Sequence, residues 1–384
     1  MSKTWDVVVI GAGSVGVPAA MSLAEAGLKV LVIEQQHSPG QMNNKKAIGG
    51  IRATHSDYGK IQIGLRSIAI FSTWKERYGD HIGWLSNGYS YPAYTVADEK
   101  KLKDLMEIQW TFGLNIRWVS PQEYNDLVPG ISMNGLRGAT YSPEDGSASP
   151  LLAINAFYFK SLQYGAEYRF NEHVTGFDQD NGRITAVRTN RDIYACGDVV
   201  NAAGNHAMDI GRLLGISLPV TPDNHEGAIT EPVQRFFGPM VVDMRPAEDS
   251  LNYYFYQNDE GQVIFCITPD PPLYGVDNDS TSHFFPQVAK RMVALYPRLA
   301  YLKIRRAWRG QYPNTPDGFP LVGRSRELPN LISLVGMCGQ GFMFGPGMGE
   351  LVTRIVTGNM NEDDGRILER FNLYRDFSGM EAFK

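Results

Sequence analysis

Three glycines near the start of the chain have the spacing needed to hold the phosphates of a dinucleotide. The stretch VVVIGAGSVGVPAAMSLAEAGLKVLVIE covers residues 7–34 and places GxGxxG, residues 11–16, directly after an apolar run. In this motif Gly11 permits a tight turn, Gly13 lets the backbone approach a pyrophosphate, and Gly16 lets the next helix pack on the strand. The helix N-terminus then directs its positive end at the phosphates.

An acid closes the second apolar run at the position expected for ribose recognition. Residues 29–33 predict a second strand, and Glu34 follows that strand at the spacing of a carboxylate that binds a ribose hydroxyl. An arginine there would have favoured a 2′-phosphate. Ser14 and Val15, inside the glycine motif, and Gln35, next to the acid, complete the predicted binding turn.

Two later segments add small residues where a ligand and the backbone could meet closely. IYACGDVVNAAGNHA, from Ile193, predicts a strand that leads into Ala203 and Gly204. LISLVGMCGQGFMFGPGMGELVTRIVTG, from Leu331, predicts a strand, a glycine-rich loop that runs to Gly349, and an apolar helix. Such a loop could cradle a flat ring or a phosphate. No second GxGxxG is present, which favours FAD over a nicotinamide nucleotide.

These motifs together resemble one family. GAGSVG with Glu34, GGIRATH, VVNAAGNHA, WRGQYPNTPDGFPLVG and GMCGQGFMFGPGMGE occur in the order and approximate spacing of D-amino-acid-oxidase-like FAD oxidoreductases. The resemblance covers nearly the whole chain and is strongest to the sarcosine oxidase and glycine oxidase branch, especially to beta subunits of dye-linked L-proline dehydrogenase. It implies FAD as cofactor and adds a set of cofactor-binding positions: Val174, Gly339, Gln340, Gly341, Phe342 and Met343.

The resemblance implies an α/β plus α+β architecture with a Rossmann-like FAD-binding domain of the GR2/DAO type and an antiparallel-sheet substrate domain. Alternating aromatic runs after Asn252, such as NYYFYQ and QVIFCIT, agree with an antiparallel sheet. We expect that sheet to roof the flavin. The predicted boundaries place the discontinuous FAD domain at 1–85, 145–215 and 323–384, and the substrate domain at 86–144 and 216–322.

The residues predicted to contact substrate are Arg52, Tyr254 and Tyr312, with Tyr256 as an alternative to Tyr254. Arg52 matches an arginine that holds the substrate carboxylate in similar enzymes, a task for which a guanidinium suits both oxygens at once. Tyr312 matches a tyrosine near the substrate. Tyr254 and Tyr256 share one face of a roof strand by period-two spacing, and either could line the pocket. Each of these residues could instead have a structural role. Arg52 could serve the flavin or pair with a neighbouring acid, and the tyrosines could be packing residues.

Three departures from the family pattern bear on function. Gly310 stands where monomeric sarcosine oxidase attaches FAD through a cysteine, so we expect noncovalent FAD. Met343 lies in the segment where that oxidase has a lysine that binds the carboxylate. QVIFCIT has no lysine to promote reaction with oxygen and leaves Phe265 or a neighbour there, so we expect a different electron acceptor. Lys45 or Lys46 could supply such a charge instead.

The predicted reaction is oxidation of an amino acid or N-substituted amino acid, of the proline, sarcosine, glycine or opine type, to an imine by hydride transfer to flavin N5. No Asp–His or paired-carboxylate motif is evident. The alternatives are a 2-hydroxy-acid dehydrogenase on the same scaffold, an amine oxidase that uses oxygen, and a noncatalytic FAD-bearing subunit of a complex.

Composition limits partners and location. The 384 residues are 43% hydrophobic, and the net charge of −5 is dispersed, which argues against nucleic acid. Cys196, Cys266 and Cys338 are odd in number and lack CxxC spacing, which argues against a disulfide framework and a zinc site. The apolar stretches are too short to span a membrane, and the residues before Asp6 are too few for a signal peptide. We expect a cytoplasmic protein with a small amino-acid substrate; a partner subunit or electron carrier, and an oligomer, stay open.

Overall fold

The first apolar run becomes an inner strand of a largely parallel sheet in the computed structural model, which describes residues 4–381. β1 (Trp5–Ile10) pairs in parallel with β2 (Val30–Glu34) and β11 (Ile193–Asn201). Strands of this kind are buried on both faces, which explains their nearly continuous apolar sequence. The path is β17-β18-β11-β1-β2-β8, and the remaining strands are β8 (Glu167–Phe170), β9 (Val174–Asp180), β10 (Arg183–Thr189), β17 (Leu321–Arg324) and β18 (Leu331–Val335).

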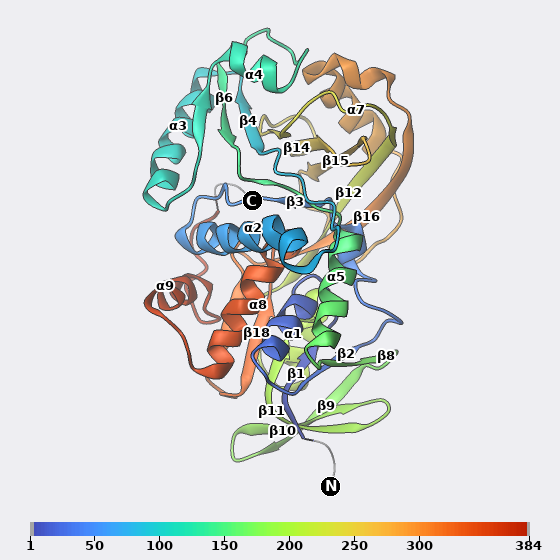
Figure 1. The fold of residues 1–384 in the computed structure, drawn as a ribbon, viewed down its shortest axis with the longest axis vertical. Helices are drawn as coiled ribbons and strands as arrows, with labels where there is room; N and C mark the ends of the chain where they lie inside the picture. The colour runs from blue at the N-terminus through green and yellow to red at the C-terminus, as the bar shows by residue number, and fades with distance from the viewer. Residues whose placement is uncertain (1–3, 382–384) are drawn as a thin grey trace. The chain divides into compact units, whose positions relative to one another are not determined.

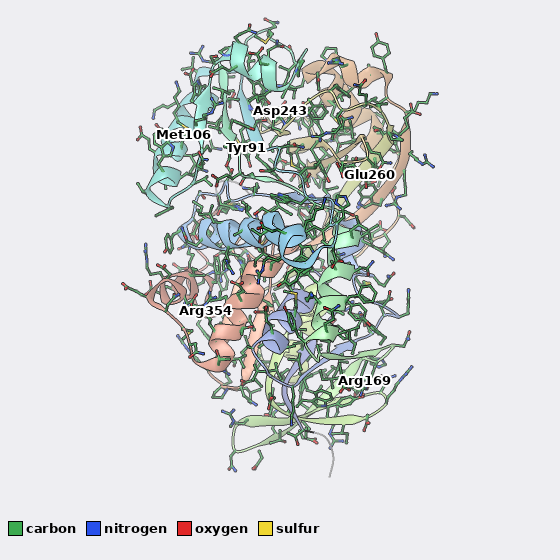
Figure 2. All side chains as sticks on the ribbon, viewed as in Figure 1. Tyr91, Met106, Arg169, Asp243, Glu260 and Arg354 are labelled. Carbon is green, nitrogen blue, oxygen red and sulfur yellow. The ribbon has the colours of Figure 1, made fainter. Side chains whose placement is uncertain are left out.

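Three helices cover one face of this sheet. α1 (Gly16–Glu25) lies between α5 (Pro150–Gln163) and α8 (Gly341–Thr357) and contacts both (Figure 1). The guanidinium of Arg354 on α8, labelled in Figure 2, bonds the carboxylate of Asp364 at 2.7 Å and so ties α8 to the helix that follows it. The other helical segments are η1 (Asn43–Lys46), η2 (Gly204–His206), α6 (Ala207–Leu213) and α9 (Glu362–Phe371).

The aromatic strand runs form a second sheet with the path β16-β12-β15-β14-β13-β4-β6-β5. From β12 to β5 the neighbouring strands are antiparallel except for β13 and β4, which are parallel and carry Asp243 and Tyr91, labelled in Figure 2. The strands are β4 (Tyr89–Ala93), β5 (Arg117–Val119), β6 (Gly138–Ser142), β12 (Thr221–Pro232), β13 (Met240–Asp243), β14 (Ser250–Gln257), β15 (Gln262–Pro269) and β16 (Ile304–Asn314). β3 (Gly50–Ile51) and β7 (Gly146–Ser147) form a separate antiparallel pair.

The two faces of this second sheet have different neighbours. Ala228, Phe255 and Phe265 are directly paired across adjacent strands and belong to one buried cluster, in which the Phe265 ring stacks on Phe284 of α7 with centroids 6.0 Å apart. Cys266 lies on the other face, because neighbouring residues of a strand point to opposite sides. The helices that accompany this sheet are α2 (Tyr58–Tyr78), α3 (Val96–Thr111), α4 (Pro121–Leu127), α7 (Phe284–Leu295) and η3 (Pro297–Tyr301).

Contacts along the chain divide it into two units. Unit 1 is Met1–Ala47, Pro150–Pro222 and Tyr312–Lys384, and unit 2 is Ile48–Ser149 and Asp223–Gln311. Residues 48–85, which we had expected in the FAD domain, group with unit 2, because β3 pairs with β7 and α2 contacts β3. The other boundaries differ from the predicted ones by 5 to 11 residues.

The glycine-rich C-terminal segment differs from the predicted loop. Helix α8 already begins at Gly341 and contains Gly345, Gly347 and Gly349. A Cβ on Gly345 would overlap the carbonyl oxygen of Ser14, and one on Gly349 would lie 2.7 Å from the carbonyl oxygen of Pro18. These glycines therefore permit close helix packing against the start of α1.

Between residues 4 and 381, no helix is both long enough and apolar enough to traverse a lipid bilayer.

Candidate cofactor and substrate sites

The turn between β1 and α1 has the geometry that its three glycines predict. Gly11 has φ +105°, and a Cβ there would lie 2.7 Å from the carbonyl oxygen of Ala202. A Cβ on Gly16 would overlap the Gly11 carbonyl oxygen, whereas a Cβ on Gly13 would meet no atom within 4 Å. Gly11 and Gly16 are thus required by the fold, while the space beside Gly13 fits close approach of a pyrophosphate.

Glu34 secures this turn with both carboxylate oxygens. Oε2 accepts a hydrogen bond from the Ala12 amide at 2.7 Å, and Oε1 accepts one from the Gln36 amide at 2.8 Å. Each oxygen retains a further lone pair, so the arrangement is compatible with a ribose hydroxyl as additional donor. The predicted acid therefore also has a structural task that its spacing alone did not indicate.

Two helix N-termini converge at Ser14. The Ser14 carbonyl oxygen lies against Gly345 in α8, and its Cβ lies 3.8 Å from the position of a Cβ on Gly341, the first residue of α8. Neither α1, with N-cap Val15, nor α8, with N-cap Gln340, has a side-chain cap. Helices α6 and α7 also lack such caps, so the convergence at Ser14 is what marks this place as suited to negative charge.

Gln340 provides a second indication that this region suits FAD. The side chain is 4% exposed, and within residues 4–381 no donor bonds its Oε1 atom. A buried acceptor of this kind requires a donor, and FAD carries hydroxyl and N–H donors on its ribityl chain and ring. The open side of Gly13 and the Gln340 acceptor both fit the predicted cofactor.

The remaining predicted cofactor residues lie around the same sheet edge in unit 1. Ala203 follows β11 and lies against Gly11, since its Cα is 3.3 Å from the Cβ position there. Val174 begins β9, close in sequence to Glu172, whose amide bonds the Glu34 carbonyl oxygen at 3.0 Å. Gly204 starts η2, Phe342 and Met343 lie in the first turn of α8, and Gln35 is exposed.

Tyr312 is also in unit 1 and lies against the C-terminal loop. Its ring Cδ2 and Cε2 atoms lie 2.5 Å from the position of a Cβ on Gly339, whose φ is +80°. Residue 339 must therefore be glycine for two reasons: its positive φ disfavours other residues, and a side chain there would overlap the Tyr312 ring. The next residue toward the N-terminus, Cys338, is buried and also has a positive φ of 50°.

Arg52 lies in a buried polar cluster of unit 2. Only 8% exposed, it donates from Nη1 to the Thr54 carbonyl oxygen and lies 3.0 Å from Nδ1 of His55. Asp145 fixes the same segment, because its Oδ1 accepts from the Ala53 amide at 2.8 Å and its Oδ2 accepts from the Thr54 hydroxyl. Asp145 thus holds the backbone that follows the predicted carboxylate-binding residue, and the Thr54 carbonyl oxygen holds its guanidinium.

Burial dominates the electrostatics of this cluster. It raises the pKa of Asp145 to about 6, although the hydrogen bonds from Thr54 and Ala53 and the charge of Arg52 act in the opposite direction. Burial also lowers the pKa of His55 well below its usual value, and the positive charges of Arg52 and Lys60 lower it further. His55 is therefore a neutral imidazole beside the Arg52 guanidinium.

The tyrosines of the unit 2 sheet meet the segment that leads to Arg52. The Tyr256 hydroxyl donates to the Ile48 carbonyl oxygen at 2.6 Å, and a Cβ on Gly50 would overlap the Tyr89 hydroxyl. Tyr254 pairs with Cys266 and is half-buried on the same face as Tyr256. The shared face predicted for these two tyrosines is present, and Tyr256 takes the tighter contact.

The expectation named Phe265 or a neighbour, and of these Phe265 does not lie on the face of the two tyrosines. It faces α7, so on β15 the residues beside Tyr254 and Tyr256 are Cys266 and Ile264. The side opposite α7 also receives Gly227, where a Cβ would lie 2.6 Å from Cδ1 of Ile48. The absence of lysine from residues 262–269 is unaffected by this correction.

A buried Asp–His pair was missed at the level of sequence. Nε2 of His225 lies 3.1 Å from Oδ2 of Asp223, and their side chains are 5% and 6% exposed. The spacing of two residues on β12 places both on one face of the strand, which is the signal in the sequence DNH that would have found them.

The predicted site residues therefore fall in both units. Arg52 and Tyr254 lie in unit 2. Unit 1 contains Gly11, Gly13, Ser14, Val15, Gly16, Glu34, Gln35, Val174, Ala203, Gly204, Tyr312, Gly339, Gln340, Gly341, Phe342 and Met343.

Comparison with known proteins gives consistent matches over this whole architecture. The DAO family model, described as FAD dependent oxidoreductase, matches residues 6–355. The crystal structure of L-proline dehydrogenase from P. horikoshii superposes with a TM-score of 0.90 at 31% identity and covers 98% of both chains. The sequence-level prediction of a DAO-type fold is therefore confirmed.

Two curated relatives differ in how much of their length is matched. Mouse sarcosine dehydrogenase, a mitochondrial protein, is 26% identical over 94% of this chain, which spans only 41% of that protein. Sarcosine oxidase subunit beta from Arthrobacter sp is 24% identical, with 98% of this chain and 92% of the relative covered.

Proposed function

Since the chain belongs to the DAO family of FAD-dependent oxidoreductases, we propose that it oxidises the C–N bond of an N-substituted amino acid to an imine. The names of the matched relatives support this class, because sarcosine and L-proline both carry a secondary amine next to a carboxylate. The observation that carries the proposal is the buried Arg52, whose guanidinium bonds the Thr54 carbonyl oxygen in a segment that Asp145 holds through Ala53 and Thr54.

FAD, when bound, accepts a hydride from the carbon next to the substrate nitrogen. The Gly11–Gly16 turn and the start of α8 hold the cofactor, and Glu34 binds its ribose. Arg52 pairs with the substrate carboxylate through charge-assisted hydrogen bonds. Tyr254 and Tyr312 contact the substrate, and the buried tyrosines around Arg52 exclude water. These roles orient the reacting carbon without requiring a covalent protein intermediate.

An anaerobic titration tests the proposed substrate class. Oxidised protein is mixed with L-proline, sarcosine, glycine or an opine, and with lactate as a 2-hydroxy acid, while the flavin absorbance is followed. Bleaching by the N-substituted amino acids supports the proposal. Bleaching by lactate alone identifies a 2-hydroxy-acid dehydrogenase, and a flavin that none of these compounds reduces identifies a noncatalytic FAD-bearing subunit.

The proposed FAD attachment is noncovalent. Gly310 has no side chain that could form a thioether, and it occupies the position that resembles the cysteine attachment site. Precipitation with acid should therefore leave the yellow flavin in the supernatant. Flavin that stays with the precipitated polypeptide would overturn this part of the proposal.

We also propose an electron acceptor other than oxygen. A cation beside reduced flavin would stabilise the negative charge of superoxide as it forms. Strand β15 has no cation on the face that it shares with Tyr254 and Tyr256, where it carries Ile264 and Cys266. The half-buried Lys46, with its pKa lowered by burial and by Lys45, is the competing source of positive charge. Turnover with a dye acceptor should exceed peroxide formation in air; equal rates would make the protein an oxidase.

The acceptor in the cell is proposed to be a partner subunit or electron carrier in the cytoplasm. The relative from Arthrobacter is itself named as a subunit, which supports an assembly for this chain. Copurification of untagged proteins with the tagged chain, followed by reconstitution of turnover without dye, tests this proposal.

A further inference from the structure

The sheet of unit 1 ends at β8, which leaves one side of that strand open. Among residues 4–381 the strand neighbour of β8 is β2, with which it pairs in parallel, and β8 is the last strand of the path (Figure 1). The backbone groups on the opposite side of an edge strand form a template on which a strand of another chain can pair. This edge is therefore a place where a second molecule could extend the sheet.

Helix α5 carries an exposed apolar stripe. Four of its large apolar side chains are between 39% and 59% exposed: Leu151, Leu152, Phe159 and Leu162. At 100° per residue their positions fall within about 100° of the helix circumference, so they share one side of α5. The helix contains a single charged residue, Lys160. A contiguous exposed apolar surface of this kind marks an interaction site.

Ring contacts join the stripe of α5 to the edge strand. The Phe159 ring centroid lies 5.3 Å from that of Tyr158, which in turn lies 4.8 Å from the Tyr168 centroid and 6.0 Å from that of Phe170, both on β8. The hydroxyls of Ser161 and Tyr168, 2.7 Å apart, add a hydrogen bond between the same two elements. The four exposed side chains of α5 and the strand β8 thus form one continuous surface, which we call the β8–α5 surface.

The charges of β8 are complementary to a second copy of the same strand. Glu167 and Arg169, the latter labelled in Figure 2, form an ion pair at 3.3 Å and lie on the face opposite the Tyr168 ring. When two β8 strands pair antiparallel about Tyr168, Glu167 of each copy lies opposite Arg169 of the other. Pairing centred on Arg169 would oppose two arginines, which is unfavourable. The alternation of charge therefore favours self-pairing centred on Tyr168.

We propose that the chain forms a two-fold symmetric homodimer through the β8–α5 surface. The two-fold axis passes between the paired β8 strands, perpendicular to the sheet, and joins the two sheets of unit 1 into one. It places both α5 helices side by side on the same face of the joined sheet, where their apolar stripes pack together. A strand of any sequence could fill the open edge, but a second copy also satisfies the charges of Glu167 and Arg169. This assembly does not depend on the reaction that the flavin catalyses.

Analytical ultracentrifugation of the FAD-loaded full chain measures the dissociation constant of this dimer. Arg169→Glu and Glu167→Arg each place like charges opposite one another at two symmetric positions, so each should weaken the dimer at least about tenfold. The double variant Glu167→Arg with Arg169→Glu restores opposite charges with their places exchanged. Its dissociation constant should return to within about threefold of the wild-type value, because the two positions are directly coupled.

Phe159→Lys tests the apolar stripe. A charge buried between two α5 helices should weaken the dimer at least about 100-fold. Ile108→Lys is the matched control, since Ile108 is 45% exposed on α3 in unit 2. Arg188→Glu is the control for charge reversal, because Arg188 is an exposed arginine of unit 1 that pairs with Asp178. Both controls should leave the dissociation constant unchanged, and every variant should retain its flavin absorbance.

Four results would overturn the proposal. The first is a wild-type chain that stays monomeric at every concentration measured, and the second is a dimer that Phe159→Lys and both charge reversals leave intact. The third is a double variant that dimerises as weakly as the single ones, which would exclude pairing about Tyr168. The fourth is equal weakening by the two controls. A monomeric wild type that forms a one-to-one complex with a different subunit, lost in Phe159→Lys, would assign the β8–α5 surface to that subunit in place of a second copy.

Discussion

The cofactor turn of unit 1 and the polar cluster of unit 2 are built on opposite principles. In unit 1, the turn contains three glycines within six residues and depends on the absence of side chains, since a Cβ on Gly16 would overlap the Gly11 carbonyl oxygen. In unit 2, side chains do the work and come from distant parts of the chain: Tyr256 bonds Ile48 across 208 residues, and Asp145 bonds Ala53 across 92.

The two sites should therefore be damaged by opposite kinds of substitution. A turn made by close backbone approach is damaged by added atoms, because close-packed backbone cannot yield. A cluster made by buried polar side chains is damaged by removed atoms, because each lost group leaves a partner unsatisfied. Four substitutions test this contrast, beginning with the one of greatest expected effect.

Gly16→Ala should be the most damaging change. Its methyl group meets the Gly11 carbonyl oxygen, so the FAD-free protein should lose at least about 3 kcal/mol, the upper range for overpacking. Urea denaturation measures this loss, and flavin absorbance after desalting measures retained FAD. Gly13→Ala is the matched control: its methyl meets no atom within 4 Å, so it should preserve stability and weaken FAD binding. Full stability in Gly16→Ala would break the comparison.

Asp145→Asn should change the pH dependence of stability. Burial raises the pKa of Asp145 from 3.8 to about 6, so between these values the folded state holds a proton that the unfolded state has released. Stability from this group is therefore present at low pH and lost as pH rises toward 6, by about 3 kcal/mol. Asparagine does not titrate. Unfolding free energies at about pH 4, 5, 6 and 7 should show wild type falling relative to the variant, and parallel curves would contradict the assignment.

Arg52→Ala should weaken the transition state for carboxylate substrates while FAD is retained. Loss of one charged, hydrogen-bonded contact corresponds to roughly 1.5–3 kcal/mol in kcat/KM. Arg309→Ala is the control, since Arg309 is equally buried in unit 2 but bonds Asp277 at 2.7 Å on the α7 side of the sheet. That variant should lose stability only. Unchanged kinetics in Arg52→Ala would remove Arg52 from the substrate site, and lost flavin would reassign it to the cofactor.

Tyr256→Phe should have the smallest effect. It removes the hydrogen bond to the Ile48 carbonyl oxygen at a cost of about 1 kcal/mol in unfolding free energy. Because Ile48 leads to Arg52, the KM for substrate should rise as well. Tyr253→Phe loses a comparable bond, to the Arg291 carbonyl oxygen at 3.0 Å, on the opposite face and should leave KM unchanged. Equal KM values in the two variants would argue against a substrate-facing role for the Tyr256 side.

Features that depend on interactions between nearby residues could be predicted from the amino-acid sequence. The βαβ start, the glycine turn and the acid at residue 34 follow one another within 30 residues, so strand burial, turn geometry and helix polarity can be read in order. The shared face of Tyr254 and Tyr256 also needed only the two-residue period of a strand, and the same period would have revealed Asp223 with His225.

Which side of each element is buried, and which residues bury it, depends on contacts between distant segments. Gly345 and Gly349 gave a loop-like composition, yet they lie in helix α8, and glycine is needed there because α1 packs too close for a side chain. Phe265 turned toward α7 rather than the predicted roof because Phe284 and the apolar cluster of that helix lie on its side of the sheet. Residues 48–85 joined unit 2 through pairing with residues almost 100 positions away. Local patterns specify the conformation of a segment, but burial depends on the surfaces that distant segments bring to it.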